Sequence, residues 1–206
     1  MGRIVVSEYI TLDGVVEDPG GAEQFEHGGW SFQSFNDEYF SYKHAELFDC
    51  GCLLLGRVTY QALQAAWPVR SDVTGLSGRM NMLPKYVVSG SLQGVTWNNS
   101  TIIRPPLADR ITGLKKSQSK DILVIGSRTL VQFLMTHDLV DEYRLLLHPI
   151  VLGSGQKLFE DSKVRNLKLT GTKPFATGVV VLTYVPDRSK VVTLRPEAFP
   201  HASSSR

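Results

Sequence analysis

The sequence predicts an α/β fold in which a mostly parallel sheet is covered by helices on both faces and ends in antiparallel strands at its C-terminal edge. Apolar segments alternate with helical ones through most of the chain, which is the rhythm of βαβ units. The last two apolar segments, 167–173 and 179–184, have no helix between them, which indicates a hairpin. The 206 residues, 42% of them hydrophobic, suffice for one core. We expect one domain over residues 1–185 and a tail over residues 186–206.

The N-terminal part is expected to hold one strand, one long loop and one helix. Residues 4–9 alternate in hydrophobicity and are rich in Val and Ile, which predicts a strand in the middle of the sheet. Gly and Pro then punctuate residues 13–30, and a loop of this length in a compact domain is usually functional or mobile. Asn36 can cap a helix that runs to about Asp49.

The middle of the chain alternates between expected strands and helices, as a parallel sheet requires. Apolar runs predict strands at 52–55, 85–89, 101–103, 122–125 and 141–148. Helical periodicity predicts helices at 58–66, 107–116 and 129–137. The polar tail contains Pro196 and Pro200, and we expect it to be loosely held or to lie on a partner subunit.

Charge and hydropathy argue against several classes of function. The 22 basic and 20 acidic residues nearly balance, whereas proteins that bind nucleic acid or a membrane surface usually carry a basic face. The basic residues between Arg104 and Lys120 are better interpreted as a solvated helix face. No apolar run has the length of a membrane span or of an N-terminal signal, so we expect a cytoplasmic protein.

Neither a metal site nor a disulfide is expected. The five histidines are scattered and do not form a ligand spacing with acids. Cys50 and Cys52 are the only cysteines. A disulfide between them would be strained, and a zinc site would need further ligands nearby. We expect two buried, reduced thiols.

The segment LLLGRVTY, residues 53–60, ends an apolar strand on a glycine and continues with an arginine and a threonine. Gly56 allows close approach of the backbone to a ligand, Arg57 can form a forked pair of hydrogen bonds to a phosphate, and Thr59 can cap the next helix. Because free N–H groups at a helix start carry roughly half a positive charge, this junction is a candidate anion site. The alternative is a plain turn followed by a solvated charge.

The segment VIGSRTLVQFL, residues 124–134, repeats this plan. Gly126 and Ser127 follow a strand, and Arg128 and Thr129 fall in the first turn of a helix. Together the two junctions suit the pyrophosphate and an additional phosphate of one dinucleotide cofactor. Neither junction is a G-x-G-x-x-G fingerprint or a Walker loop.

These two segments, in order with three others, resemble the dihydrofolate reductase-like superfamily. The resemblance is to stand-alone proteins related to the C-terminal reductase domain of riboflavin-pathway bifunctional deaminase-reductases. The other segments are RIVVSEYITLDG (3–14), KYVVS (85–89) and LVDEYRLLLHPIVLGSGQKLF (139–159). The resemblance covers roughly residues 3–185 and implies a three-layer dihydrofolate reductase-like fold.

The resemblance implies an NADPH-dependent reductase with the nicotinamide laid across the sheet. It assigns the adenosine-side phosphates to Gly56, Arg57 and Thr59, the 2′-phosphate to Ser89, and the pyrophosphate to residues 126–129. Relatives commonly carry a glycine pair or triplet at this last site. Here Ser127 and Arg128 intervene, which leaves room for a changed phosphate geometry.

The implied substrate is a small heteroaromatic or imine-type molecule, pterin-like or aminopyrimidine-like. Two alternatives remain, namely a riboflavin-pathway 5-amino-6-(5-phosphoribosylamino)uracil reductase and a non-catalytic NADPH-binding sensor module. Relatives usually form homodimers, so we also expect a homodimer. Val179, Val181 and Leu182 of the last hairpin would be costly to expose at a sheet edge, so we place the interface nearby.

Acids at the start of the first long helix are the candidates for substrate binding. In folate-reducing relatives an acid on this helix binds the pterin ring, and Asp37 and Glu38 stand at the matching helix start. We take Asp37 as the candidate catalytic residue. The alternative is that both acids only complement the helix dipole.

Four further residues have two interpretations each. Asp13 can stabilise an Asx-turn or transfer a proton. Trp30 and Phe32 can cover a planar ring or pack as apolar residues before a helix. His148 titrates near neutrality if unperturbed and could protonate a substrate, or it can be structural at a strand end.

Overall fold

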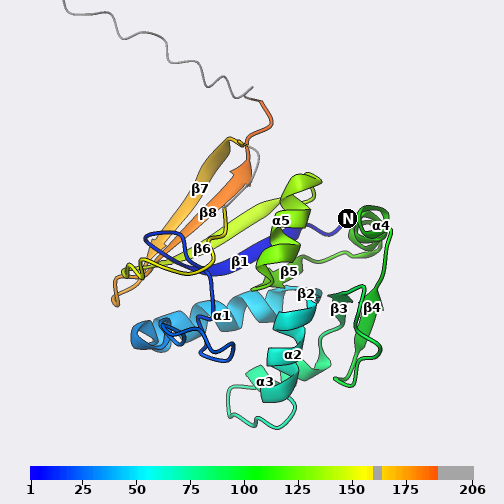
Figure 1. The fold of residues 1–206 in the computed structure, drawn as a ribbon, viewed down its shortest axis with the longest axis horizontal. Coiled ribbons are helices and arrows are strands. Elements are labelled where there is room, and N and C mark those ends of the chain that lie inside the picture. Colours follow the sequence, from blue (N-terminus) through cyan, green and yellow to red (C-terminus); the bar gives the residue numbers. More distant parts are fainter. Residues whose placement is uncertain (160–163, 190–206) are drawn as a thin grey trace, which may run out of the picture.

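The computed structural model describes residues 1–159 and 164–189, which build one eight-stranded sheet in the order β4-β3-β2-β5-β1-β6-β8-β7 (Figure 1). The strands are β1 (Ile4–Thr11), β2 (Cys52–Gly56), β3 (Lys85–Val88), β4 (Ser100–Ile103), β5 (Ile122–Ile125), β6 (Glu142–His148), β7 (Leu167–Pro174) and β8 (Val180–Pro186). Pairing is parallel from β4 to β6. It is antiparallel between β6 and β8 and between β8 and β7.

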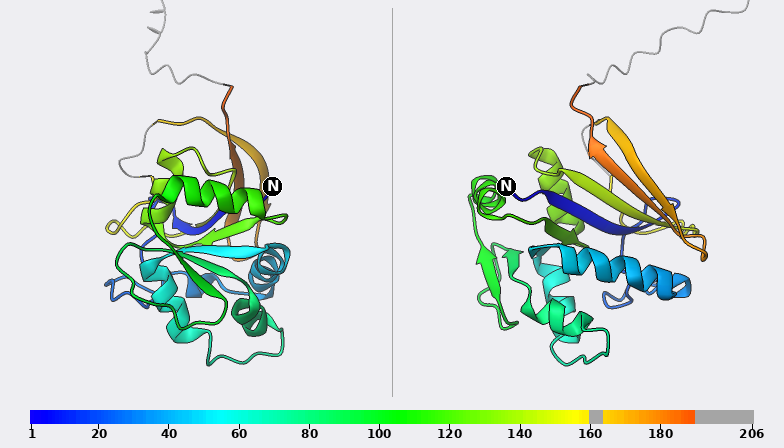
Figure 2. Two further views of the ribbon diagram at one scale, coloured as in Figure 1. Left: turned by 90° about the vertical axis from the view of Figure 1, so that its right-hand side faces the viewer. Right: turned by 180° about the vertical axis from the view of Figure 1, so that it is seen from behind.

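Helices cover both faces of the sheet (Figure 2). They are α1 (Asp37–Asp49), α2 (Arg57–Ala66), α3 (Leu76–Met82), α4 (Leu107–Ser117) and α5 (Arg128–Thr136), with a short 3-10 turn, η1 (Phe32–Ser34). Residues of α4 and α5 pack against one core cluster, which contains Val6 and Val124. Residues of α1, α2 and α3 pack against a second cluster, which contains Val5 and Leu123. Because β1 and β5 are buried on both faces, apolar residues lie on both sides of these strands, and β1 also carries the buried polar residues Ser7, Glu8 and Thr11.

The predicted α/β class, the mostly parallel sheet and the antiparallel C-terminal strands are confirmed. The expected strands and helices are present and differ only at their ends. The sequence pattern does not predict α3, which begins after Gly75 in a left-handed conformation with φ 75°. The Asp72 carboxylate accepts the Leu76 and Ser77 N–H groups at 3.0 and 2.7 Å. A seven-residue helix built on such a turn is too short to show a clear period.

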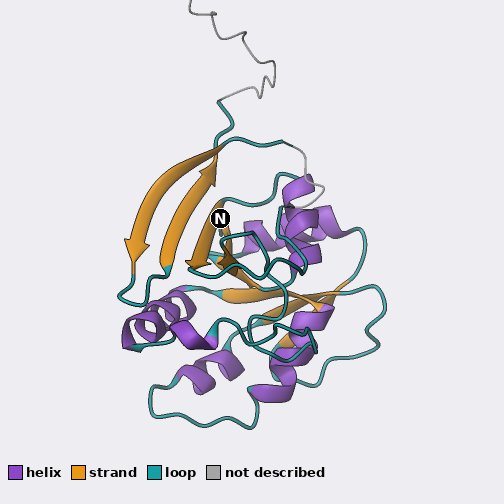
Figure 3. Cartoon of the chain, turned by 60° about the vertical axis from the view of Figure 1, so that its left-hand side comes forward, coloured by secondary structure: helices purple, strands orange, loops and turns teal. Residues whose placement is uncertain are grey.

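The hairpin of β7 and β8 extends the sheet beyond β6 (Figure 3). Val179 and Val181 are buried in a third cluster with Tyr39 and Phe175. The expectation that these valines need a partner subunit to cover them is therefore wrong. They are covered because β7, not β8, forms the sheet edge and because α1 supplies Tyr39 on that face.

The C-terminal boundary lies slightly later than expected. β8 runs to Pro186, and the Asp187 N–H donates to the Asn166 carbonyl at 2.9 Å, so pairing continues past residue 185. Most of the expected tail, residues 190–206, lies outside the described residues.

Cys50 and Cys52 are free and buried, as expected. Cys50 is the C-cap of α1, so only Cys52 belongs to a strand. Burial raises the pKa of Cys50 to about 11 and that of Cys52 to about 12, which keeps both as thiols. Among the helices that the structure describes, none combines the length and the hydropathy needed to cross a membrane.

The six strands β1 to β6 share one direction, so their carboxyl ends meet at a single edge, here called the carboxyl edge. The loops after these strands, the start of α2 and the start of α5 lie at this edge (Figure 1). In open α/β sheets ligands bind in the crevice outside the carboxyl ends of the strands. A ligand is therefore expected to bind at the carboxyl edge.

Candidate active site

The two glycine junctions predicted from the sequence are joined directly by hydrogen bonds. β2 and β5 are neighbouring strands, which places Gly56 and Ser127 side by side. The Gly56 N–H donates to Ser127 Oγ at 2.8 Å, and the Ser127 N–H donates to Thr59 Oγ1 at 2.9 Å. The starts of α2 and α5 therefore form one continuous surface at the carboxyl edge.

The backbone at Gly126 and Ser127 is left-handed, with φ 55° and 67°. A Cβ at Gly126 would lie 3.0 Å from Thr59 Oγ1 and 3.1 Å from Thr59 Cγ2, so glycine is needed for this close approach. Ser127 keeps its side chain despite the strained conformation. Its hydroxyl accepts the Gly56 bond and donates to the Ile125 carbonyl at 3.3 Å, which offsets part of that strain.

Neither helix start carries a side-chain cap. Gly56 is the N-cap of α2 and Ser127 is the N-cap of α5, and neither helix has a side-chain hydrogen bond at this position. The expectation that Thr59 caps α2 is therefore wrong, because the helix already starts at Arg57 and the Thr59 hydroxyl faces Ser127. Uncapped first-turn N–H groups remain for water or for an anionic ligand.

The two arginines of these junctions point in different directions. Arg57 is exposed, and its Nη1 donates to Gln61 Oε1 at 3.0 Å, so it stays on its own helix and can turn outward. Arg128 Nε donates to the Lys157 carbonyl at 2.8 Å, which ties α5 to the loop after β6. Thr129 is exposed on the first turn of α5. Of these three side chains, Arg57 is the best placed to bind a phosphate.

Ser89 directly follows β3 at the same edge, but its hydroxyl is used within the protein. Ser89 Oγ accepts the N–H groups of Ser91 and Leu92 at 3.3 and 3.0 Å and closes the turn after β3. Arg104 follows β4 and donates to the Gly90 and Leu92 carbonyls of this turn at 3.1 and 2.7 Å. The sequence interpretation treated Arg104 only as part of a solvated face, although its position directly after a parallel strand was a usable signal.

Asp13 anchors two loops of the carboxyl edge to each other. Its carboxylate accepts the Thr11 hydroxyl at 2.6 Å and the Gly153 N–H at 2.8 Å. The bond from Thr11, together with backbone N–H groups of Gly153 and Leu152, lowers its pKa to about 2. An ionised acid held this way positions loops, which matches the turn interpretation more closely than proton transfer.

The two acids at the start of α1, Asp37 and Glu38, differ in their contacts. Asp37 is exposed at the first position of the helix, where Asn36 caps α1 as expected by accepting the Tyr39 N–H at 2.9 Å. Glu38 Oε2 accepts the Ala176 N–H in the β7–β8 turn at 3.1 Å. Substrate binding by Asp37 stays a prediction.

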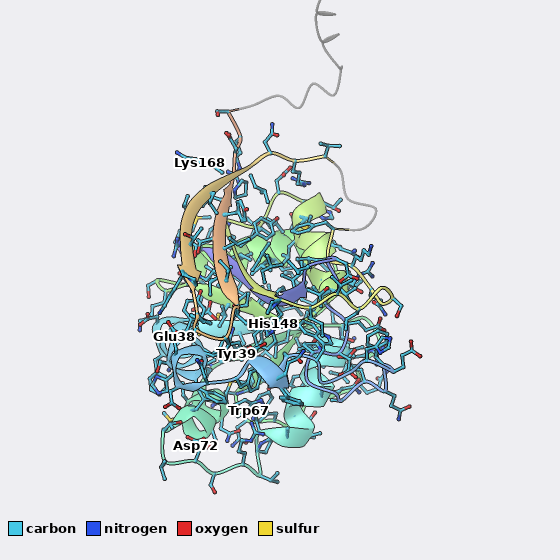
Figure 4. The ribbon with its side chains drawn as sticks, turned by 90° about the vertical axis from the view of Figure 1, so that its left-hand side faces the viewer. Glu38, Tyr39, Trp67, Asp72, His148 and Lys168 are labelled. Atoms are coloured by element: carbon cyan, nitrogen blue, oxygen red, sulfur yellow. The ribbon has the colours of Figure 1, made fainter. Side chains whose placement is uncertain are left out.

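His148, at the end of β6, lies near Tyr39 of α1 (Figure 4) and belongs to an aromatic cluster that the sequence did not reveal. Its ring centroid is 5.1 Å from that of Trp30, 5.8 Å from Tyr9 and 6.1 Å from Tyr39. His148 is fully buried, and within residues 1–159 and 164–189 neither its ring nitrogens nor the Tyr39 hydroxyl have a hydrogen-bond partner. Burial lowers the pKa of His148 to about 4, so the imidazole is neutral near pH 7.

Trp30 and Phe32, the two aromatic candidates of the long loop, behave differently. Trp30 is buried, and its indole N–H donates to the Glu17 carbonyl at 2.8 Å. Phe32 is exposed in η1. Trp30 therefore covers His148 as a packed residue of the loop, while Phe32 remains accessible at the surface.

A buried charged network joins α1 to the sheet beside this cluster. Lys43 Nζ donates to Ser7 Oγ at 2.9 Å and to Glu46 Oε2 at 2.6 Å. Arg144 Nη1 donates to Glu46 Oε1 at 3.2 Å. Burial raises the pKa of Glu46, but Lys43 and Arg144 outweigh it, so the pKa is lowered overall. The network fixes α1, and with it Tyr39, over the carboxyl half of β1.

A cavity in the described residues has no evident link to this site. A cavity of about 170 Å³ lies at the opposite end of the sheet, between the end of α5 and the strands β6 to β8, and includes Met135, Tyr143 and Arg165. Among the described residues, no group of three or more His, Cys, Asp or Glu side chains could hold a metal ion.

Comparison with known proteins places this geometry in a family. The family model of the RibD C-terminal domain matches residues 3–181. The Bacillus subtilis (strain 168) protein YyaP is 30% identical over 186 residues, which cover 88% of this chain and 94% of YyaP.

Two solved structures are similar in fold. A putative riboflavin biosynthesis protein from Shewanella sp. PV-4 has a TM-score of 0.71 and 20% identity, over 91% of this chain and 100% of that chain. Dihydrofolate reductase from Enterococcus faecalis, complexed with NADP(H), has a TM-score of 0.59 and 12% identity, over 90% of this chain and 97% of that chain.

Proposed function

The chain belongs to the RibD C-terminal domain family, and on that premise we propose that it is an NADPH-dependent reductase of a small heteroaromatic or imine-type substrate. The two similar folds, one from a putative riboflavin biosynthesis protein and one from a dihydrofolate reductase complexed with NADP(H), support this class of chemistry. A riboflavin-pathway 5-amino-6-(5-phosphoribosylamino)uracil reductase is the alternative within the same family.

The observation that carries the proposal is the pair of uncapped helix starts at the carboxyl edge. Thr59 and Ser127 hold the starts of α2 and α5 together through the two bonds at 2.8 and 2.9 Å. Each start presents N–H groups with roughly half a positive charge. A dinucleotide carries both a pyrophosphate and, in NADPH, a 2′-phosphate, so two adjoining anion sites fit this cofactor.

The residues present fit NADPH at specific points. Gly126 has no Cβ and so packs closely against Thr59, which brings the two helix starts together where the pyrophosphate is proposed to bind. Arg57 is exposed next to the start of α2 and can pair with the 2′-phosphate. When bound, NADPH supplies the hydride. The protein has to hold the nicotinamide end near the centre of the carboxyl edge and to exclude water.

The aromatic cluster is the proposed substrate side. Trp30, Tyr39 and His148 offer planar faces, and the Tyr39 hydroxyl and both His148 nitrogens have no hydrogen-bond partner among the described residues. Buried polar atoms without partners cost roughly 1–3 kcal/mol each, so they are often kept for a ligand. A neutral imidazole can donate one hydrogen bond and accept another, which suits a heterocycle with an N–H and a carbonyl.

The first test separates binding from turnover. NADPH oxidation is followed with a panel of pterins, quinones and aminopyrimidines, beside a fluorescence titration of NADPH binding. Binding with oxidation by at least one member supports the reductase. Tight binding without oxidation by any member would instead favour the sensor module, and no binding at all would contradict the proposal.

The second test addresses cofactor choice. A charge-assisted bond to the 2′-phosphate contributes about 1.5–3 kcal/mol, so Arg57→Ala should weaken NADPH binding on the order of ten- to a hundredfold and leave NADH binding nearly unchanged. Arg110→Ala, at an exposed position on α4, is the matched control. Equal losses for both cofactors would show that Arg57 does not read the 2′-phosphate.

A further inference from the structure

Glu8 is a carboxylic acid in the middle of a central strand that is buried along most of its length. β1 lies between β5 and β6, and Glu8 is in register with Leu145 of β6. By the alternation of the strand its side chain lies on the face of Val6 and Ile10, beneath the helices α4 and α5. The residue is only 4% exposed, and its Oε1 has no hydrogen-bond partner in the part of the chain that the structure describes. No step described above uses this group.

Glu8 lies directly beside the junction at the start of α5. Ser7 pairs with Ile125, so the next residues along the two strands, Glu8 and Gly126, lie next to each other. The Gly126 backbone N–H interacts with the Glu8 carboxyl group. The acid therefore sits beneath the place where the pyrophosphate is proposed to bind.

The surroundings favour the protonated acid. Burial raises the pKa of Glu8 well above its ordinary value and outweighs the opposite effects of the Lys43 ammonium and the Gly126 N–H. Charged or titratable side chains on the elements around this position include Lys43 and Glu46 on α1, Asp109, Arg110, Lys115 and Lys116 on α4, Arg128 on α5, Arg144 and His148 on β6, and Glu17 and Lys157 in the loops. Of these, Lys43 acts appreciably on Glu8, and it is already paired with Glu46.

The charge of Glu8 decides whether the junction attracts an anion. The start of α5 offers roughly half a positive charge, whereas an ionised carboxylate beside Gly126 would add a full negative charge in a buried setting. An ionised Glu8 would therefore compete with a phosphate for the same N–H groups and repel it. A protonated Glu8 leaves the positive end of α5 uncompensated.

Resting on the proposed function, we propose that Glu8 is a further residue of the cofactor site, which must be protonated for the cofactor phosphates to bind at the start of α5. Cofactor binding and protonation of Glu8 are then coupled. By reciprocity, a bound cofactor holds the proton on Glu8 to higher pH, and a rise in pH that ionises Glu8 weakens the cofactor.

Binding of NADP⁺ to the whole protein and to Glu8→Gln tests this coupling without any substrate. Glutamine has the size of the protonated acid and cannot ionise. The dissociation constant of the unchanged protein should rise up to about tenfold per pH unit above the pKa of Glu8, since one proton is linked. Glu8→Gln should lack this rise, and Glu26→Gln, an exposed acid of the loop before α1, should keep it. Coinciding profiles of the unchanged protein and Glu8→Gln would overturn the coupling.

Infrared spectroscopy of the carboxyl stretch reports the proton directly. A protonated carboxyl band should be present at pH 7, disappear in Glu8→Gln, and titrate at higher pH when NADP⁺ is bound. A band already lost at pH 7, or a midpoint that NADP⁺ does not move, would overturn the inference. If NADP⁺ binds none of the proteins at any pH, the proposed function fails instead, and melting curves show whether each variant is folded.

Discussion

At the scale of single residues, His148 is a buried base that the folded protein holds neutral. Its pKa is lowered from an ordinary value of 6.5 to about 4 because its ring lies among Tyr9, Trp30 and Tyr39 without access to water. A proton therefore binds more readily to the unfolded chain. Because this side chain is buried, the free energy of unfolding depends on pH in the acidic range.

The sign of the pH effect follows from this difference. Between pH 6.5 and pH 4 the unfolded chain takes up a proton at His148 that the folded protein does not, so the free energy of unfolding falls as the pH falls through this window. The loss attributable to His148 is roughly 3 kcal/mol at most. His148→Phe keeps an aromatic ring but cannot titrate, so its unfolding free energy should depend less on pH.

The measurement is urea unfolding at pH 7, 5.5 and 4.5 for the unchanged protein, His148→Phe and the exposed control His27→Gln. Glu8 acts in the opposite direction, because its raised pKa stabilises the fold at low pH and this contribution is lost as the pH rises. Glu8 is present in all three proteins, so its contribution cancels when their pH slopes are compared. The same slope for all three proteins would show that His148 is accessible to protons in the folded state.

A second prediction at the scale of single residues concerns Asp37. If its carboxylate binds an aminopyrimidine-type ring, Asp37→Asn should lower turnover, because it removes the charge but keeps the size and polarity of the side chain. NADPH affinity should not change, since the phosphate contacts lie at other helix starts. Stability should fall by no more than about 1 kcal/mol, the usual contribution of an acid in a first helical turn.

Glu38→Gln is the comparison for Asp37→Asn, because Glu38 stands next to it and accepts the Ala176 N–H. Melting temperature, NADPH affinity and rate are measured for both variants with any substrate that the panel yields. Full turnover of Asp37→Asn would mean that the acid only complements the helix dipole. Equal losses for both variants would point to the β7–β8 turn instead of the substrate.

At the scale of elements, the strands and most helices could be predicted because each is an apolar or periodic run bounded by a clear turn. The contact between Thr59 and Ser127 could not, since it depends on β5 lying beside β2, and strand order is not readable from local patterns. Glu8 was missed for a related reason. A charged residue in an alternating strand usually faces solvent, but β1 is covered on both faces.

The pairing of the two helix starts gives a prediction for the junction as a unit. Ser127→Gly and Ser127→Ala both lose the hydroxyl that accepts the Gly56 N–H, so both should destabilise the protein, by about 1–3 kcal/mol for the unmet bond. Glycine adopts the left-handed conformation of residue 127 without strain. Ser127→Gly should therefore be more stable than Ser127→Ala by roughly 1 kcal/mol.

Thr59→Val extends this test to the ligand. It removes the acceptor of the Ser127 N–H and so loosens the start of α5 against the start of α2. NADPH affinity should then fall together with stability, whereas Thr136→Val, exposed near the end of α5, should leave affinity unchanged. Unfolding curves and NADPH titrations check both effects. A stability loss with unaltered affinity would separate the junction from the cofactor site.

At the scale of the whole molecule, the association state is the remaining prediction from the sequence. The apolar valines of the hairpin are buried within the chain, so they give no reason for a dimer. The reason that remains is the outer edge of β7, the last strand of the sheet, on which Leu169 is 48% exposed. A strand edge with free N–H and carbonyl groups readily pairs with a second copy.

We therefore expect a homodimer in which β7 lies at or near the interface. Light scattering at micromolar concentration should give twice the mass of the chain, and Leu169→Lys, which adds a charge at the exposed edge, should shift the protein toward the monomer. Lys168→Ala, on the same strand, removes a charge instead and should not promote dissociation. A dimer that Leu169→Lys leaves intact would place the interface elsewhere, and a monomer of the unchanged protein would remove the expectation. Since the starts of α2 and α5 belong to one chain, a monomer would still be expected to bind NADPH.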